Sequence, residues 1–420
     1  MISTKRLRET AMVLMVPVAL ALVPGAARAD IPIEAKVYGF LNAQLEAAWA
    51  NGGATPYRTT GRVSDGNSRI GFTGSITLGP KTKVLWQIEA GLNNFEQGGA
   101  NDLGILGTIV LRNTFLGVED ERAGRLVIGN NESAYRSLVG SAGELGGNLG
   151  LTVLGLDLWN NTSAQMSGNP WSVFGRGEAR YKNSVHYTSP DWWGFKVAGS
   201  YSFDELVPAG GRRDRFALGL AYRFGELRVG AGFDYQRNTG VDVANMQLGF
   251  GLHTFAENNV ATYFYKVLVS YKLPTRTFVG VGLERSNYGY AQFIAPTTSN
   301  PYSSLVTGTM SQFSFMASAA QEIGDHFVLM ASFGRLGNLD GSINGSGADF
   351  AAYQLSVGAK YSFNDVFAAY VYYTLIKNGA QQDVNFGQSP VFTNNVGTTA
   401  AFMAPGNGPN ALGLGVIARF

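Results

Sequence analysis

Cationic side chains recur at alternate positions along many segments of this 420-residue chain. Guanidinium and ammonium groups that line a confined space raise the local concentration of anions, although physiological salt screens exposed charges within about 8 Å. Acids at matching positions are fewer, and Glu46, Glu89, Asp234 and Glu284 are the clearest. The chemistry suggested is electrostatic attraction of anions. The cations that share this pattern are Arg69, Arg112, Arg125, Arg180, Lys182, Arg215, Arg223, Arg228, Lys266, Lys272, Lys360 and Arg419.

Residues that make or break covalent bonds are sparse by comparison. The chain has no cysteine, and its histidines are His186, His253 and His326, none in a local motif with a serine. A hydrolase needs a nucleophile next to a base, and the three scattered histidines do not have metal-ligand spacing. The sequence therefore predicts no enzyme, no metal site and no cofactor.

The elements that must position the charges are strands. In the last ten residues Leu412, Leu414, Val416, Ala418 and Phe420 alternate with Gly413, Gly415, Ile417 and Arg419, and similar alternation recurs along the chain. A period of two indicates a strand with one apolar and one polar face. Charged residues make up only 15 % of the chain, glycine numbers 55, and aromatics reach 12 %. Such a composition favours an all-β protein rich in turns over a helical soluble enzyme.

Sixteen strands are predicted, and the links between them are alternately short and long. The predicted strands lie near residues 34–49, 69–78, 83–93, 110–119, 124–130, 180–189, 194–204, 214–224, 226–238, 262–272, 276–287, 311–321, 327–336, 350–361, 366–377 and 410–420.

An even number of antiparallel strands with this loop pattern is typical of a transmembrane β-barrel. An apolar stripe can face hydrocarbon only if every backbone group is paired, which barrel closure achieves. Aromatic residues near strand ends fit the two membrane interfaces: Trp86, Trp192, Trp193, Phe224, Tyr361 and Phe363. The alternative is a secreted β-sandwich or propeller, but sandwiches rarely alternate short and long links so regularly. We therefore expect one barrel domain over residues 30–420.

The first 29 residues have the pattern of a cleaved signal peptide. A basic stretch (Lys5, Arg6 and Arg8) precedes a short apolar core, and Ala27-Arg28-Ala29 supplies a cleavage site. The apolar core is shorter than the roughly twenty residues of a spanning helix. Cleavage would leave 28 basic and 29 acidic groups, a net charge of −1. Bulk charge therefore gives no reason to expect nucleic-acid binding.

Four sequence features together resemble the general porins of Gram-negative outer membranes: Ser68-Arg69-Ile70-Gly71-Phe72, Arg112-Asn113-Thr114-Phe115-Leu116-Gly117, Asn183-Ser184-Val185-His186-Tyr187 and the terminal Phe420. The resemblance covers nearly the whole mature chain. It implies a homotrimer of 16-stranded barrels with short periplasmic turns and long extracellular loops. It also implies a water-filled pore narrowed by an inward-folded third loop, and a C-terminal Phe420 that the outer-membrane assembly machinery reads.

The resemblance also implies a basic cluster on the pore wall opposite acids of the third loop. By motif this role falls to Arg69 and Arg112, and on the sixth predicted strand to the pair Arg180 and Lys182. The third loop is expected at about 131–178, and Glu132, Glu144 and Asp157 remain alternatives for the facing acid. Further pore-lining cations are expected at Arg215, Arg223, Arg228, Lys266 and Lys360.

Three functions are compatible with these features. The first is a porin for passive diffusion of small hydrophilic solutes and ions, with modest anion preference. The second is a substrate-specific channel with a lumenal binding site, and the third is a barrel without transport, acting as an adhesin or structural protein. The expected partners are membrane lipids and two further copies of the chain. Small outward residues (Gly39, Ala43, Gly74 and Gly117) favour a trimer interface on the first five strands.

Overall fold

The computed structural model describes residues 33–53, 55–64, 68–92, 109–140, 173–205, 212–238, 241–242, 260–294, 304–342, 345–386, 391 and 403–420. The expected signal peptide over residues 1–29 lies outside these ranges, as do Glu144 and Asp157. The helices among the described residues are α1 (Ala134–Ser137) and the 3-10 helix η6 (Gly347–Phe350). Neither is long and apolar enough to cross a membrane.

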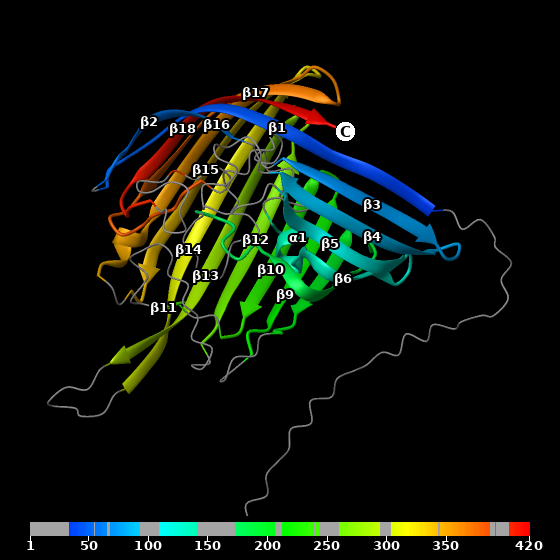
Figure 1. Ribbon diagram of the computed structural model, residues 1–420, viewed down its shortest axis with the longest axis horizontal. Helices are drawn as coiled ribbons and strands as arrows, with labels where there is room; N and C mark the ends of the chain where they lie inside the picture. The colour runs from blue at the N-terminus through cyan, green and yellow to red at the C-terminus, as the bar shows by residue number, and fades with distance from the viewer. Residues whose placement is uncertain are drawn as a thin grey trace, which may run out of the picture.

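Strands make up most of the described chain and form the curved wall seen in Figure 1. In chain order they are β1 (Ile33–Asn51), β2 (Tyr57–Ser64), β3 (Arg69–Thr77), β4 (Thr82–Leu92), β5 (Ile109–Asp120), β6 (Gly124–Glu132), β7 (Arg180–Thr188), β8 (Phe195–Ser202), β9 (Arg215–Phe224), β10 (Leu227–Gln236), β11 (Val241–Asp242), β12 (Thr262–Lys272), β13 (Thr277–Ile294), β14 (Ser304–Ile323), β15 (Phe327–Asp340), β16 (Ala352–Ser362), β17 (Phe367–Asn378) and β18 (Gly408–Arg419).

Seventeen of these strands fill the sixteen positions of a closed antiparallel barrel, which confirms the predicted fold class. From β3 onward each barrel strand pairs with the next barrel strand along the chain, and β1 closes the ring by pairing with β18 over residues 40–51. The other edge of β1 pairs with β3 over residues 33–40 and with β2 over residues 44–50. β2 and β3 therefore share one position in the barrel wall. The two-residue β11 adds only a parallel pairing to β13.

The two faces of the wall differ as the alternation predicts. On β18 the side chains of Leu412, Leu414 and Val416 are exposed, whereas Ala411 and Ile417 are buried. Large exposed apolar residues recur in this way on strand after strand. A soluble protein rarely exposes so much contiguous apolar surface, whereas a barrel in a bilayer must present such a band to hydrocarbon.

Aromatic side chains gather where the short turns meet the strands. Trp192, Trp193, Phe224 and Phe363 are exposed at these ends, as a membrane interface favours. Tyr361 is also exposed and packs against Phe363 with its ring centroid 5.1 Å away. Trp86 is different, because it pairs across the sheet with Gly74, and its ring occupies the space that a Cβ at residue 74 would need.

The described ends of the 131–178 segment pack against the polar inner face of the barrel wall. Tyr135, Val139 and Phe174 are almost fully buried, and α1 contacts β9 and β10. Two glycines of the wall make this approach feasible: a Cβ at Gly219 would lie 2.6 Å from the carbonyl oxygen of Ala134, and one at Gly232 would lie 2.9 Å from the Tyr135 ring. We call residues 133–140 and 173–179 the interior segment.

Candidate functional site

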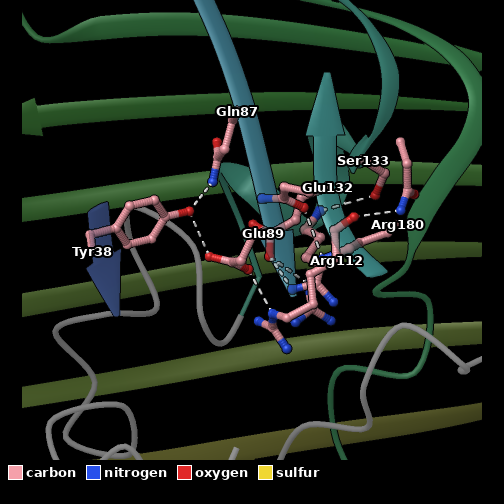
Figure 2. Close-up of polar contacts among 10 residues, drawn as sticks. Tyr38, Gln87, Glu89, Arg112, Glu132, Ser133 and Arg180 are labelled. Atoms are coloured by element: carbon pink, nitrogen blue, oxygen red, sulfur yellow. Dashed lines mark hydrogen bonds and ion pairs between the residues drawn. The ribbon is translucent and has the colours of Figure 1, made fainter. Parts of the chain in front are cut away.

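A buried ion pair lies on the inner face of β4 and β5 (Figure 2). Arg112 Nε lies 2.6 Å from Glu89 Oε1, and each side chain retains only 7 % exposure. The Tyr38 hydroxyl on β1 donates a hydrogen bond to Glu89 Oε2 at 2.9 Å and accepts one from Gln87 Nε2. Such charge-assisted hydrogen bonds hold both members of the pair in fixed positions.

A second carboxylate, Glu132, stands at the end of β6 and joins two arginines. Its Oε1 atom lies 3.1 Å from Arg136 Nε on α1 and 3.0 Å from Arg180 Nη2 on β7. Arg180 Nε also donates a hydrogen bond to Asn113 Oδ1 at 2.9 Å. The helix is placed for this contact because the Ser133 side chain caps it, accepting a hydrogen bond from the Arg136 amide.

These groups form one electropositive surface, which we call the arginine cluster: Arg69, Arg112, Arg136 and Arg180 with Glu89 and Glu132. Arg69 on β3 stacks over the Phe40 ring at 4.5 Å and interacts electrostatically with Glu89. Arg112 and Arg136 in turn act on Arg180 through their charges. Among the described residues of this cluster, four guanidinium groups stand against two carboxylates, so positive charge is in excess there.

A fully buried network joins the interior segment to β12 and β13 of the barrel wall. Lys266 Nζ on β12 lies 2.5 Å from Glu178 Oε1 and 3.2 Å from Glu284 Oε2. Tyr135 donates its hydroxyl hydrogen to Glu284 Oε2 at 2.9 Å, and the Arg176 amide donates to Glu284 Oε1 at 2.9 Å. Burial and the neighbouring Glu284 carboxylate raise the pKa of Tyr135 well above its usual range, so this hydroxyl keeps its proton.

His186 on β7 links the wall to the start of α1. Its Nε2 lies 2.7 Å from Ser184 Oγ and its Nδ1 lies 2.8 Å from Ser200 Oγ. Ser200 Oγ also accepts a hydrogen bond from the Ala134 amide at 2.8 Å. The sequence shows no local histidine–serine motif, yet the fold brings two serines to this ring. Both ring nitrogens of His186 are therefore occupied by serine hydroxyls. Through Ser200 this group of hydrogen bonds holds Ala134 and so positions the interior segment.

The family model for Gram-negative porins matches residues 17–381, most of the chain. The chain belongs to this family. Among solved structures, this porin is similar to an anion-selective porin from Comamonas acidovorans, with a TM-score of 0.63 and 16 % identity over 93 % of this chain and 100 % of that one. It is also similar to the trimer form of OmpT from Vibrio cholerae, with a TM-score of 0.58 and 15 % identity over 92 % and 99 % of the two chains. At these identities the likeness concerns the fold.

Curated relatives of the porin include the major outer membrane protein P.IB of Neisseria. The protein from Neisseria gonorrhoeae is 25 % identical over 215 residues, 50 % of this chain and 53 % of the relative. The protein from Neisseria meningitidis serogroup A is 27 % identical over 236 residues, 54 % of this chain and 60 % of the relative. The chain thus spans little more than half the length of the curated relatives that it matches. Family membership and these relatives support an outer-membrane location.

The structure brings Arg69, Arg112 and Arg180 together, as the porin motifs imply, but it leaves Lys182 exposed. Asn183 has a φ of 48° and interrupts the alternation of β7, so Lys182 does not share the buried setting of Arg180. Of the expected pair, only Arg180 joins the arginine cluster. Of the three acids considered, Glu132 contacts the cluster, while Glu144 and Asp157 lie outside the described residues.

The other predicted lumenal cations have different settings. Lys266 is fully buried beneath the interior segment, in ion pairs that offset its charge. Arg223 is exposed near the short turns, with its Nη2 atom 3.4 Å from Asp191 Oδ2. Arg215, Arg228 and Lys360 are half-buried.

The residues of the site that were not foreseen include Tyr135, Arg136 and Glu178. Arg136 had a recognisable signal, since it stands four residues after Glu132 and three after the helix-capping Ser133. Tyr135 and Glu178 had none, because their partners Glu284 and Lys266 lie far away in the sequence.

Proposed function

We propose that this protein is a passive diffusion channel for small hydrophilic solutes and ions, with a modest preference for anions. The observation that carries the proposal is the arginine cluster, in which positive charge exceeds negative charge among the residues that the structure describes. The anion-selective porin named above, which shares this fold, adds support.

The size of the preference follows from the local potential. A potential of about one kT per unit charge raises the concentration of a monovalent anion about threefold and lowers that of a cation by the same factor. The ion pairs of Arg112, Arg136 and Arg180 with carboxylates reduce the field of the cluster. The expected preference is therefore modest, and it weakens as salt concentration rises.

The proposal also gives the interior segment the role of a constriction. Tyr135 and Phe174 fill space beside the wall, and Glu132, the last residue of β6, contacts Arg136 and Arg180 where that segment begins. Solutes would then be sorted by size and by their orientation between Glu132 and the guanidinium groups.

Assembly belongs to the same proposal. We infer a homotrimer with its interface on the first five predicted strands, which correspond to β1, β3, β4, β5 and β6. We also infer secretion through a cleaved signal peptide and recognition of Phe420 by the outer-membrane assembly machinery. Phe420 pairs with Gly39 through backbone hydrogen bonds of 3.0 and 3.1 Å, and its side chain is exposed. The trimer form of OmpT is in keeping with such an assembly.

The test is a single-channel recording of the refolded protein in a planar bilayer under a potassium chloride gradient. The proposal expects a current whose reversal potential indicates preferred passage of chloride. The double variant R69Q/R112Q should move the reversal potential toward zero or beyond. The matched control E89Q/R112Q removes one charge of each sign from the same place and should change the potential much less.

Three outcomes would contradict parts of this proposal. Folded protein without current would refute the channel and favour an adhesin or structural barrel. Cation-directed reversal would keep the channel and refute the anion preference. An unchanged reversal potential in R69Q/R112Q would show that the arginine cluster does not set the selectivity.

A further inference from the structure

A polar cavity of about 180 Å³ lies beside the arginine cluster, between the barrel wall and α1. Its lining comes from β4 to β8 and from the interior segment, and includes Arg125, Asn131, Ser137, His186 and Thr188. The arginine cluster borders it only through Glu132. The cavity is thus a separate space with its own cation, Arg125.

Arg125 supplies the guanidinium group among the residues that line this cavity. Its guanidinium group stacks over the Phe115 ring, with 4.7 Å from Cζ to the ring centroid. Its Nε atom is buried and has no hydrogen-bond partner within the part of the chain that the structure describes. Glu119 lies directly across the strand pair and acts on Arg125 through its charge, but its carboxylate also pairs with Lys83 Nζ at 2.9 Å. A buried N–H donor without an acceptor is costly, and a bound carboxylate oxygen would remove that cost.

The rest of the lining suits a small molecule that carries other polar groups. Asn131, Ser137 and Thr188 present neutral donors and acceptors. The negative charge of Glu132 is offset by Arg136 and Arg180. Apolar contact comes from other lining residues, among them Val127 and Ala198. One cation, several neutral polar groups and a short apolar wall match a hydroxy acid better than a simple inorganic anion.

The position of the cavity defines where it would act along the pore. Arg125 is the second residue of β6, directly after the short turn at residues 121–123, whereas Glu132 is the last residue of that strand. The cavity therefore extends from the arginine cluster toward the short-turn end of the barrel. A solute that had passed the cluster from the long-loop side would meet this space next.

We propose that this cavity is a binding site for small hydroxy-carboxylates, with Arg125 holding the carboxylate group. The inference rests on the proposed function, since the ligand reaches the cavity through the pore. Binding there converts simple diffusion of such anions into saturable passage, while chloride passes without saturation.

Lactate and its uncharged analogue lactamide are the probes for the test. Conductance of the full-length mature protein in planar bilayers is measured as potassium lactate rises at constant ionic strength, set with potassium chloride. The lactate-dependent change should saturate, and lactamide should produce none. R125Q should raise the half-saturating lactate concentration at least fivefold, whereas R125K, which keeps the charge without the planar fork, should raise it less.

Two further variants separate the site from a general loss of charge. R228Q removes a cation from another strand of the wall and should leave the half-saturating concentration within twofold of the unmodified protein. A198L adds bulk to the cavity without changing any charge and should abolish saturation. Heat-induced loss of β-sheet circular dichroism shows whether each variant is folded.

The outcomes distinguish this inference from the proposed function. Absence of any chloride current would refute the channel itself. A chloride current together with no saturation by lactate, or saturation that is unchanged in R125Q and A198L, would overturn the binding site alone.

Discussion

Glu132 and Arg180 lie 48 residues apart in the sequence, yet their side chains meet at 3.0 Å where β6 ends and β7 begins. This contact joins the two described ends of the 131–178 segment. Arg136, the third residue of α1, meets the same carboxylate oxygen at 3.1 Å. One carboxylate thus sets both the position of the helix and the separation of the two strands.

Replacing Glu132 with glutamine should weaken this closure. Arg136 and Arg180 have side chains only 1 % exposed, so two buried guanidinium groups would lose their counter-charge, at a cost of about 2 to 3 kcal/mol. The expected results are a lower unfolding temperature in detergent and a stronger preference for anions. The control is E121Q, because the Glu121–Lys81 pair at 3.7 Å is exposed. Equal unfolding temperatures in the two variants would argue against the role given to Glu132.

A side chain at Gly232 should displace the interior segment. The Cβ alone would lie 2.9 Å from the Tyr135 ring and 3.2 Å from Val139, and leucine extends further into the same space. We expect G232L to change single-channel conductance by at least half, because α1 must move. At Gly199 the nearest atom to an added Cβ is 3.8 Å away, so G199A is the matched control and should conduct normally. Normal conductance in G232L would mean that α1 does not limit the pore.

Lys266 should matter more for stability than any exposed lysine of the barrel. K266M leaves Glu178 and Glu284 buried together without their cation, which costs about 3 to 5 kcal/mol in comparable buried pairs. The triple variant K266M/E178Q/E284Q removes the charges together and should recover much of that loss. Lys272 forms a partly exposed pair with Glu322 at 3.3 Å, so K272M should cost at most about 1 kcal/mol. Thermal unfolding followed by circular dichroism ranks the three variants.

The segment that follows β17 should respond to pH near neutrality. Burial raises the pKa of Asp383 to about 7, well above the ordinary value of 3.8, and Arg176 opposes this shift through its charge. Because the folded-state pKa is the higher one, the stabilising contribution of the proton is complete below about pH 4 and is lost as pH rises through 7. Hydrogen exchange of the amides of residues 380–386 should therefore accelerate, relative to the intrinsic rate, between pH 5 and 8.

The variant D383N isolates this effect, since asparagine keeps the shape and cannot ionise. Its amides over residues 380–386 should show the same protection at pH 5 and pH 8 after correction for intrinsic exchange. A pH dependence that survives in D383N would assign the effect to another group.

The strand pattern was predictable from the sequence because hydrocarbon outside and polar groups inside impose a period of two on every strand of such a barrel. The last strand was expected at 410–420 and is found at Gly408–Arg419. What failed at Lys182 was the assumption that alternation continues unbroken through β7. Asn183 adopts a left-handed conformation there, and a sequence period does not encode such a local backbone change.

The candidate site was predictable only in part, because strand alternation predicts residues on the barrel wall and does not predict residues placed by contacts across the lumen. Arg69, Arg112 and Arg180 stand on the wall, where strand parity fixes the direction of a side chain. Arg136 and Glu178 belong to the interior segment, whose path depends on contacts with distant residues such as Lys266. Local patterns define the wall, whereas packing across the lumen defines what fills it.

The pairing of β1 with β18 has a consequence for how the molecule is made. This seam joins Phe40–Asn51 to Gly408–Arg419. Nearly the whole barrel-forming part of the chain lies between these two strands, and its ends must meet before the backbone groups of the seam can form hydrogen bonds. Until β18 has been synthesised, β1 and β17 both keep a free edge that can pair with other chains. Contacts of such sequence separation form slowly, and an unfinished barrel is prone to aggregation. The chain must therefore be kept unfolded until its last strand is available.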